Sequence, residues 1–137
     1  MAFIMPRRKK WLKVDWESAS DIKKRIKDIV KTSDFNWINT SYIFCMRSKN
    51  SSSRAYARIW GLSKVWQMAL EVKPSYIIEV LSEKFDKLSK TEQNKILIHE
   101  LAHIPKNFSG SLLPHIRRRG KRNFEDRVRI LIRKFNK

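Results

Sequence analysis

Residues 89–105 of the chain read SKTEQNKILIHELAHIP. Ser89 and Glu92 have the spacing of a capping box, in which each side chain accepts a hydrogen bond from the other residue's backbone N–H, and an apolar run follows them. Pro105 disfavours helical geometry at the residue before it. The pattern therefore predicts a helix from Leu88 to about Ile104.

This helix carries the sequence His99-Glu100-Leu101-Ala102-His103, which fits the motif H-E-x-x-H. Histidines four residues apart lie on one helix face about a turn apart, so both imidazoles can bind one tetrahedral zinc ion. Glu100 then lies beside the metal. Because zinc lowers the pKa of bound water toward ~7, this carboxylate can accept the water's proton and pass it to a leaving amine. The motif therefore predicts a zinc site with Glu100 as the catalytic base.

A third metal ligand is expected downstream of the motif. His115 is the remaining histidine of the chain, it follows a glycine-containing loop, and Pro114 stiffens the approach to it. We therefore predict His115 as the third ligand, with Glu125 or Asp126 as the alternative. If His115 binds the metal, one of these acids could orient a ligand imidazole or stabilise a helix N-terminus.

Hydrophobic spacing predicts five further elements. Apolar residues at helical spacing indicate an N-terminal helix, with Ser18, Ser20 or Asp21 as its cap. Alternating apolar residues indicate three strands, of which the first is packed on both faces and the third opens after Pro74. The elements are a helix at Ser18–Lys31, strands at Trp37–Met46, Arg54–Trp60 and Ser75–Leu81, and a last helix at Phe124–Phe135.

Together these elements predict an α+β domain. It has an N-terminal helix, a three-stranded sheet, the motif helix, a loop at Lys106–Pro114 leading to the third ligand, and a C-terminal helix. We expect Ser75–Leu81 to be the sheet edge nearest the motif helix. A peptide substrate could add to such an edge as an extra strand.

Length and composition indicate one intracellular domain. A chain of 137 residues that is 42% hydrophobic has room for one core. Its single cysteine, Cys45, cannot form an internal disulfide and is expected to be a buried small hydrophobe. No signal-peptide pattern and no apolar run near the ~20 residues of a membrane span is present. We therefore expect a soluble, cytoplasmic protein that does not enter membranes.

The charge is strongly basic and concentrated at both ends. There are 31 Lys and Arg residues against 13 Asp and Glu residues, a formal net charge of +18. We read residues 1–16 as a basic extension and residues 17–137 as the domain with its basic C-terminal helix. Such charge makes nucleic acid, with RNA or ribonucleoprotein favoured, the expected partner. The residues expected to contact phosphates are Arg7, Arg8, Lys9, Lys10, Arg117, Arg118, Arg119, Lys121 and Arg122.

Four short motifs make the chain similar to a known family. They are ARIWG at 57–61, YIIEV at 76–80, HELAHIP at 99–105, and the pair Pro114-His115. Over roughly Tyr42 to His115, the sequence resembles the small zincin-like metallopeptidases of archaea and phages. The resemblance implies a zincin fold, zinc on the three histidines and Glu100 as general base. It implies no particular substrate, and both basic tails lie outside it.

Two functions follow from these observations. The first is a zinc-dependent endopeptidase that its tails recruit to nucleoprotein substrates. The second is a non-catalytic RNA-binding or ribosome-associated protein that retains a zincin fold with structural zinc. Glu100 favours the first, because a structural zinc ion needs no general base. The net charge of +18 favours the second.

Overall fold

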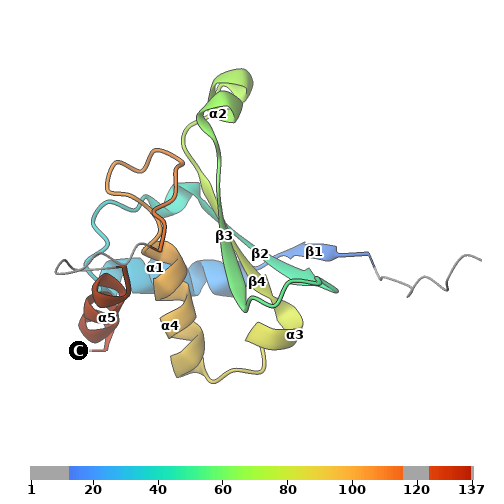
Figure 1. The fold of residues 1–137 in the computed structure, drawn as a ribbon, viewed down its shortest axis with the longest axis vertical. Coiled ribbons are helices and arrows are strands. Elements are labelled where there is room, and N and C mark those ends of the chain that lie inside the picture. The colour runs from blue at the N-terminus through green and yellow to red at the C-terminus, as the bar shows by residue number, and fades with distance from the viewer. Residues whose placement is uncertain (1–12, 116–123, 137) are drawn as a thin grey trace, which may run out of the picture.

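The computed structural model describes residues 13–115 and 124–136 (Figure 1). The strands are β1 (Asp15–Ser18), β2 (Ile43–Lys49), β3 (Ala57–Gly61) and β4 (Tyr76–Leu81), and they form one mixed sheet in the order β1-β2-β4-β3. The helices are α1 (Ser20–Thr32), α2 (Lys64–Leu70), α3 (Ser82–Phe85), α4 (Lys90–Leu101) and α5 (Phe124–Phe135), and Thr40–Tyr42 form a short 3₁₀ helix, η1. The predicted α+β class is confirmed.

The core lies between one face of the sheet and the helices. Side chains alternate along a strand, so Ile43 and Cys45 of β2 share a face with Ile78 and Val80 of β4, and all four are buried. α1 packs on β2, α4 packs on β3, and α5 packs on α4 and α1. The helices add Ile22, Ile26, Ile29, Leu97, Leu101, Val128 and Leu131 to the same apolar cluster. This packing fixes the position of α4, which carries the metal-binding motif.

The opposite face of the sheet is more open to solvent. Phe44, Trp60 and Ile77 lie on that face and are exposed. On the same face, two residues further along β4 than Ile77, Glu79 is fully buried. Figure 1 shows α2 at the far end of the β3–α2–β4 segment, away from α1, α4 and α5. The sheet therefore uses one face for the core and leaves exposed aromatic residues on the other.

The prediction of three strands is wrong, because β1 pairs with Met46–Lys49 as a fourth strand. This pairing also carries β2 to Lys49, beyond Met46, where the predicted strand ends. β2 starts later than predicted because Asn39 caps η1, its side chain accepting a hydrogen bond from the Ser41 backbone N–H at 3.1 Å. Phe44 is 52% exposed, so the strand is not packed on both faces. Neither α2 nor α3 was predicted.

The predicted sheet edge is also wrong. β4, which matches the prediction Ser75–Leu81, lies inside the sheet, where Ile78 is paired with Cys45 on one side and Ile59 on the other. Within the described sheet, the edge strand next to α4 is β3. The error arose because apolar alternation reports burial of a face and not the order of strands.

Three predicted helices are present, with differences at their ends. α5 spans the predicted residues. At α4, the Ser89 hydroxyl accepts a hydrogen bond from the Glu92 backbone N–H at 3.2 Å, as the capping box requires. At α1 the N-cap is instead Ala19, which makes no side-chain cap; its backbone N–H donates to the Cys45 carbonyl at 2.9 Å. None of the helices in the described part of the chain is long and apolar enough to cross a membrane.

Candidate metal centre

Three histidines meet where α4 ends. His99 belongs to the last turn of α4, His103 follows the helix, and His115 comes from the loop that returns to it. One nitrogen from each imidazole can be chosen so that all three lie within 4.8 Å of one another. The ring centroids are 5.2 Å apart for His99 and His103, 4.9 Å for His99 and His115, and 4.4 Å for His103 and His115. The group could hold one metal ion.

The motif does not lie wholly on the helix. α4 ends at Leu101, and the chain continues in a tighter turn: the His103 N–H donates to the Glu100 carbonyl at 3.1 Å, and the Ile104 N–H to the Leu101 carbonyl at 3.0 Å. Bonds to the third preceding residue are typical of helix ends, and Pro105 disfavours a continued α-helix. His103 therefore lies on a turn, close to the helical position that the motif predicts.

Backbone hydrogen bonds hold His103 in place. Its Nδ1 lies 2.6 Å from the carbonyl oxygen of Leu113, and the Leu113 N–H donates to the His103 carbonyl at 2.7 Å. A carbonyl oxygen can only accept, so Nδ1 carries the proton. Nε2 then keeps its lone pair, as a metal ligand requires. This bond selects the tautomer in which His103 can bind a metal through Nε2.

The loop that provides this carbonyl is itself fixed. The Tyr76 hydroxyl of β4 donates to the Ser111 carbonyl at 2.8 Å and accepts from the Gly110 N–H at 2.8 Å. Gln67 of α2 donates through Nε2 to the Ser109 carbonyl at 2.8 Å. Tyr76 and Gln67 are buried. Their roles were not predicted, because no local sequence pattern shows that a distant loop binds the side chains of Tyr76 and Gln67.

The ring of Phe124 packs against all three histidines. Its ring stacks on His103 with 4.2 Å between centroids and lies 4.7 Å from His115 and 5.1 Å from His99. Phe124 was predicted to start the last helix and was given no role in the site. Phe124 lies four residues before Val128, and this helical spacing is the sequence signal that its ring faces the buried side of the helix.

The two acids considered as alternative ligands both lie in the first turn of α5. Glu125 Oε1 is 3.7 Å from His115 Nδ1, and Asp126 Oδ1 is 3.6 Å from Arg129 Nη1. Neither acid belongs to the three-residue group that could hold a metal. Glu125 is therefore placed where it can orient the imidazole of His115.

Burial sets the protonation of the centre. It lowers the pKa of His99 and of His103 below the ordinary histidine value, and the neighbouring imidazoles lower the pKa of His99 further. Both rings are therefore neutral at pH 7, which is the form that binds metals. Burial also raises the pKa of Glu100 to about 7. Two neutral imidazoles beside a carboxyl of near-neutral pKa suit the binding of a metal ion.

A cleft of about 440 Å³ opens beside His99. His99, Glu100 and Glu125 supply its polar groups. Lys95 adds a cation, Tyr56 adds a phenol ring, and the apolar lining is Ala55, Ala57, Ile96, Val128 and Ile132. The cleft thus runs from the start of β3 to the C-terminal end of α4, where it reaches Glu100.

All nine residues predicted to contact phosphates lie outside the described residues. They are Arg7, Arg8, Lys9, Lys10, Arg117, Arg118, Arg119, Lys121 and Arg122.

Comparison with protein families gives one match. The model of a family described as "Putative phage metallopeptidase" matches residues 14–134, which include all four strands and most of α5. The match is wider than the stretch from Tyr42 to His115 that carried the resemblance. Comparison with curated proteins and with solved structures found no significant match.

Proposed function

Because this chain belongs to the family described as putative phage metallopeptidases, we propose that it is a zinc-dependent endopeptidase with a zincin-like site. The three imidazoles, whose nitrogens lie within 4.8 Å of one another beside Glu100, carry the proposal. His99, His103 and His115 would hold the metal. A set of three imidazoles with no thiolate suits zinc, and catalytic zinc sites commonly use three protein ligands.

When bound, zinc supplies Lewis-acid chemistry that polarises a peptide carbonyl and makes water a stronger nucleophile near neutral pH. Glu100 accepts a proton from the attacking water and delivers it to the leaving amine. Its pKa of about 7 suits both transfers. Leu113 keeps His103 in the tautomer that binds metal, and Phe124 excludes water from the buried side of the cluster.

The substrate is proposed to bind along β3. This strand is the edge of the described sheet next to α4, and Ala55, Tyr56 and Ala57 line the cleft where it begins. An extended peptide that pairs with a sheet edge gains main-chain hydrogen bonds whatever its side chains are. The apolar walls of the cleft favour a substrate with an apolar side chain near the cleaved bond.

Substitution of Glu100 by Gln tests the proposal. The amide keeps the shape of the side chain but cannot accept the water's proton. We expect protein purified without a histidine tag to contain one zinc per chain in both the wild type and Glu100→Gln, and only the wild type to hydrolyse peptides. Glu92→Gln, an exposed change on the same helix, is the control and should stay active. An unchanged rate in Glu100→Gln would exclude Glu100 as the base.

A second candidate function is binding to nucleic acid without catalysis, which the net charge of +18 favours. Under that alternative zinc is structural. The wild type would then bind zinc and RNA but hydrolyse no peptide, and Glu100→Gln would behave like the wild type in every assay.

A further inference from the structure

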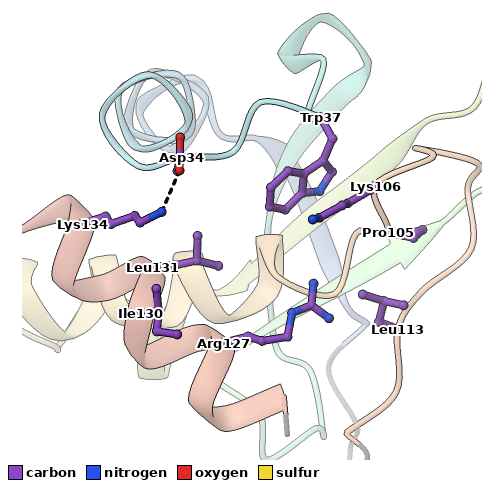
Figure 2. A pocket seen from close by; sticks show the side chains of 9 residues that line it. All are labelled: Asp34, Trp37, Pro105, Lys106, Leu113, Arg127, Ile130, Leu131 and Lys134. Atoms are coloured by element: carbon purple, nitrogen blue, oxygen red, sulfur yellow. Dashed lines mark hydrogen bonds and ion pairs between the residues drawn. The ribbon is translucent and has the colours of Figure 1, made fainter. Parts of the chain in front are cut away.

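A second pocket, of about 550 Å³, lies on the other side of α5 from the cleft. Val128 and Ile132 of α5 line the cleft, whereas Arg127 and Leu131 line this second pocket. Figure 2 shows its lining side chains, which come from α5, the segment that follows α1, and the loop after α4. Its volume is within the range of small-molecule binding sites. The pocket is thus separate from the candidate metal centre and large enough for a ligand of its own.

The apolar walls of the pocket are preformed. The Trp37 indole is held by its Nε1, which donates to the Ile104 carbonyl at 3.0 Å, and by the edge of the Phe35 ring at 5.4 Å between centroids. Leu113 and Leu131 line the pocket with it. An aromatic or apolar part of a ligand would therefore find a fixed surface and would order few side chains on binding.

The polar lining is cationic. Three of the lining side chains, Lys106, Arg127 and Lys134, are basic, and the one acid is Asp34, so the lining carries a formal charge of +2. Lys134 is bound to Asp34 at 2.7 Å (Figure 2). Lys106 lies over the Trp37 ring at 5.9 Å, and within the described ranges no carboxylate forms an ion pair with Lys106 or Arg127. Two cations thus remain available to a ligand.

We propose that this pocket binds a nucleotide through its phosphate monoester. Such a phosphate carries about −1.5 to −2 charges near pH 7, which balances the lining, whereas a carboxylate carries one. Arg127 can bind two phosphate oxygens with its planar guanidinium, and Lys106 adds a second cation. The base packs on the apolar wall beside Trp37. The same chemistry is offered by a free mononucleotide and by the 5′-phosphorylated end of a single strand.

An occupied pocket would contact the supports of the candidate metal centre. Leu113 lines the pocket, and its carbonyl oxygen also binds His103. Trp37 lines the pocket as well, and its indole N–H donates to the carbonyl of Ile104, the residue that follows His103. Binding is nevertheless independent of the proposed peptidase activity, and its test needs no substrate.

Titration calorimetry with adenosine monophosphate, on the full chain at low salt, tests the proposal. We expect the wild type to bind it, and Arg127→Gln and Lys106→Gln each to raise the Kd about tenfold, since hydrogen bonds between charged groups are among the strongest. The control is Arg133→Gln, which removes the same charge from an exposed position of α5 outside the pocket and should change the Kd less than about twofold. Thermal unfolding of each variant verifies its fold.

Two results would overturn the proposal. One is that the wild type does not bind adenosine monophosphate. The other is that Arg133→Gln weakens binding as much as Arg127→Gln, because the attraction would then be general to the basic surface. Either result would leave the zinc peptidase proposal standing, since neither measurement depends on metal or hydrolysis.

Two pentanucleotides, with and without a 5′-phosphate, distinguish the sources. Tighter binding of the phosphorylated strand than of the mononucleotide supports a strand end as the ligand, and the reverse order supports a free nucleotide. Equal binding of the two strands would contradict recognition of a phosphate monoester.

Discussion

At the scale of single residues, His103 and His115 are positioned by different kinds of groups. His103 is oriented by a backbone carbonyl and packed on Phe124, whereas His115 is half exposed and has the carboxylate of Glu125 at 3.7 Å. The Leu113 carbonyl cannot be removed by substitution of a side chain, but Glu125 can. Substitutions at His115 and at Glu125 can therefore distinguish a metal ligand from a residue that orients a ligand.

We predict that His115→Ala loses stoichiometric zinc and that Glu125→Ala keeps it with an affinity about 10–100-fold weaker. Loss of a ligand removes a bond to the metal, whereas loss of an orienting carboxylate only loosens the ring. Zinc content after dialysis and competition with a chelator measure both effects. If Glu125→Ala loses the metal and His115→Ala retains it, Glu125 is the third ligand.

Glu79 gives the fold a pH dependence that is separate from the metal centre. It accepts hydrogen bonds from Arg58 at 3.0 Å, Ser48 at 2.5 Å and Trp60 at 2.9 Å. Burial alone would raise the pKa of Glu79, but these bonds outweigh burial and hold the pKa below its ordinary value of 4.5. The ionised carboxylate therefore stabilises the folded chain.

A carboxyl whose pKa is lower in the folded chain stabilises it fully above the unfolded pKa, and this contribution is lost as the pH falls through the folded pKa. We predict that the free energy of unfolding decreases as the pH falls below about 4.5, and that Glu79→Gln shows a smaller decrease. Urea unfolding at a series of acid pH values measures this. Identical pH profiles for the two proteins would show that Glu79 does not contribute.

At the scale of elements, the candidate metal centre depends on how the loop after α4 meets β3 and α2. A methyl group built on Gly61, the last residue of β3, would lie 2.1 Å from the carbonyl oxygen of Gly110. Gly110 has φ +95, a conformation that other residues rarely adopt, and Leu62 and Gln67 leave no space for a side chain there. The two glycines allow the loop to approach the sheet closely.

We predict that Gly61→Ala weakens zinc binding by displacing this loop, and with it Leu113 and His115. The control is Ser89→Ala at the other end of α4, which removes the helix cap and should cost about 1 kcal/mol of stability without changing zinc affinity. Urea unfolding and chelator competition separate the two effects. A Gly61→Ala protein with lower stability but unchanged zinc affinity would show that the loop does not position the site.

At the scale of the whole molecule, the residues of the candidate metal centre and most of the excess positive charge lie in different parts of the chain. The histidines and Glu100 lie in the described fold, whereas much of the basic excess lies in the tails. The long-range attraction of a +18 chain to a polyanion falls with salt, because each phosphate contact releases counterions. The slope of log affinity against log salt concentration therefore measures the number of contacts between basic side chains and phosphates.

We predict that removing residues 1–10 and neutralising the basic cluster before α5 flattens the salt dependence of nucleic-acid binding and leaves zinc occupancy unchanged. The cluster is Arg117, Arg118, Arg119, Lys121 and Arg122. Filter binding to a single-stranded RNA at several salt concentrations measures the slope. Equal slopes for the variant and the wild type would mean that the tails serve solubility and not binding.

The sequence alone was sufficient for the features that depend on neighbours along the chain. The cap at Ser89, the presence of α4, the extent of α5, and the spacing of His99, Glu100 and His103 all follow from helical period and capping, which act within a few residues. His115 lies beside the other two histidines, and its role as a metal ligand stays a prediction.

Only the tertiary structure decided the features that join distant segments. It placed β4 inside the sheet and β3 at its edge, added β1 as a fourth strand, and used the Leu113 carbonyl and the Phe124 ring to hold His103. Strand order and backbone hydrogen bonds leave no periodic signal, because the same alternating pattern can pair with either neighbour and any carbonyl can accept. These choices are made by the packing of the whole chain.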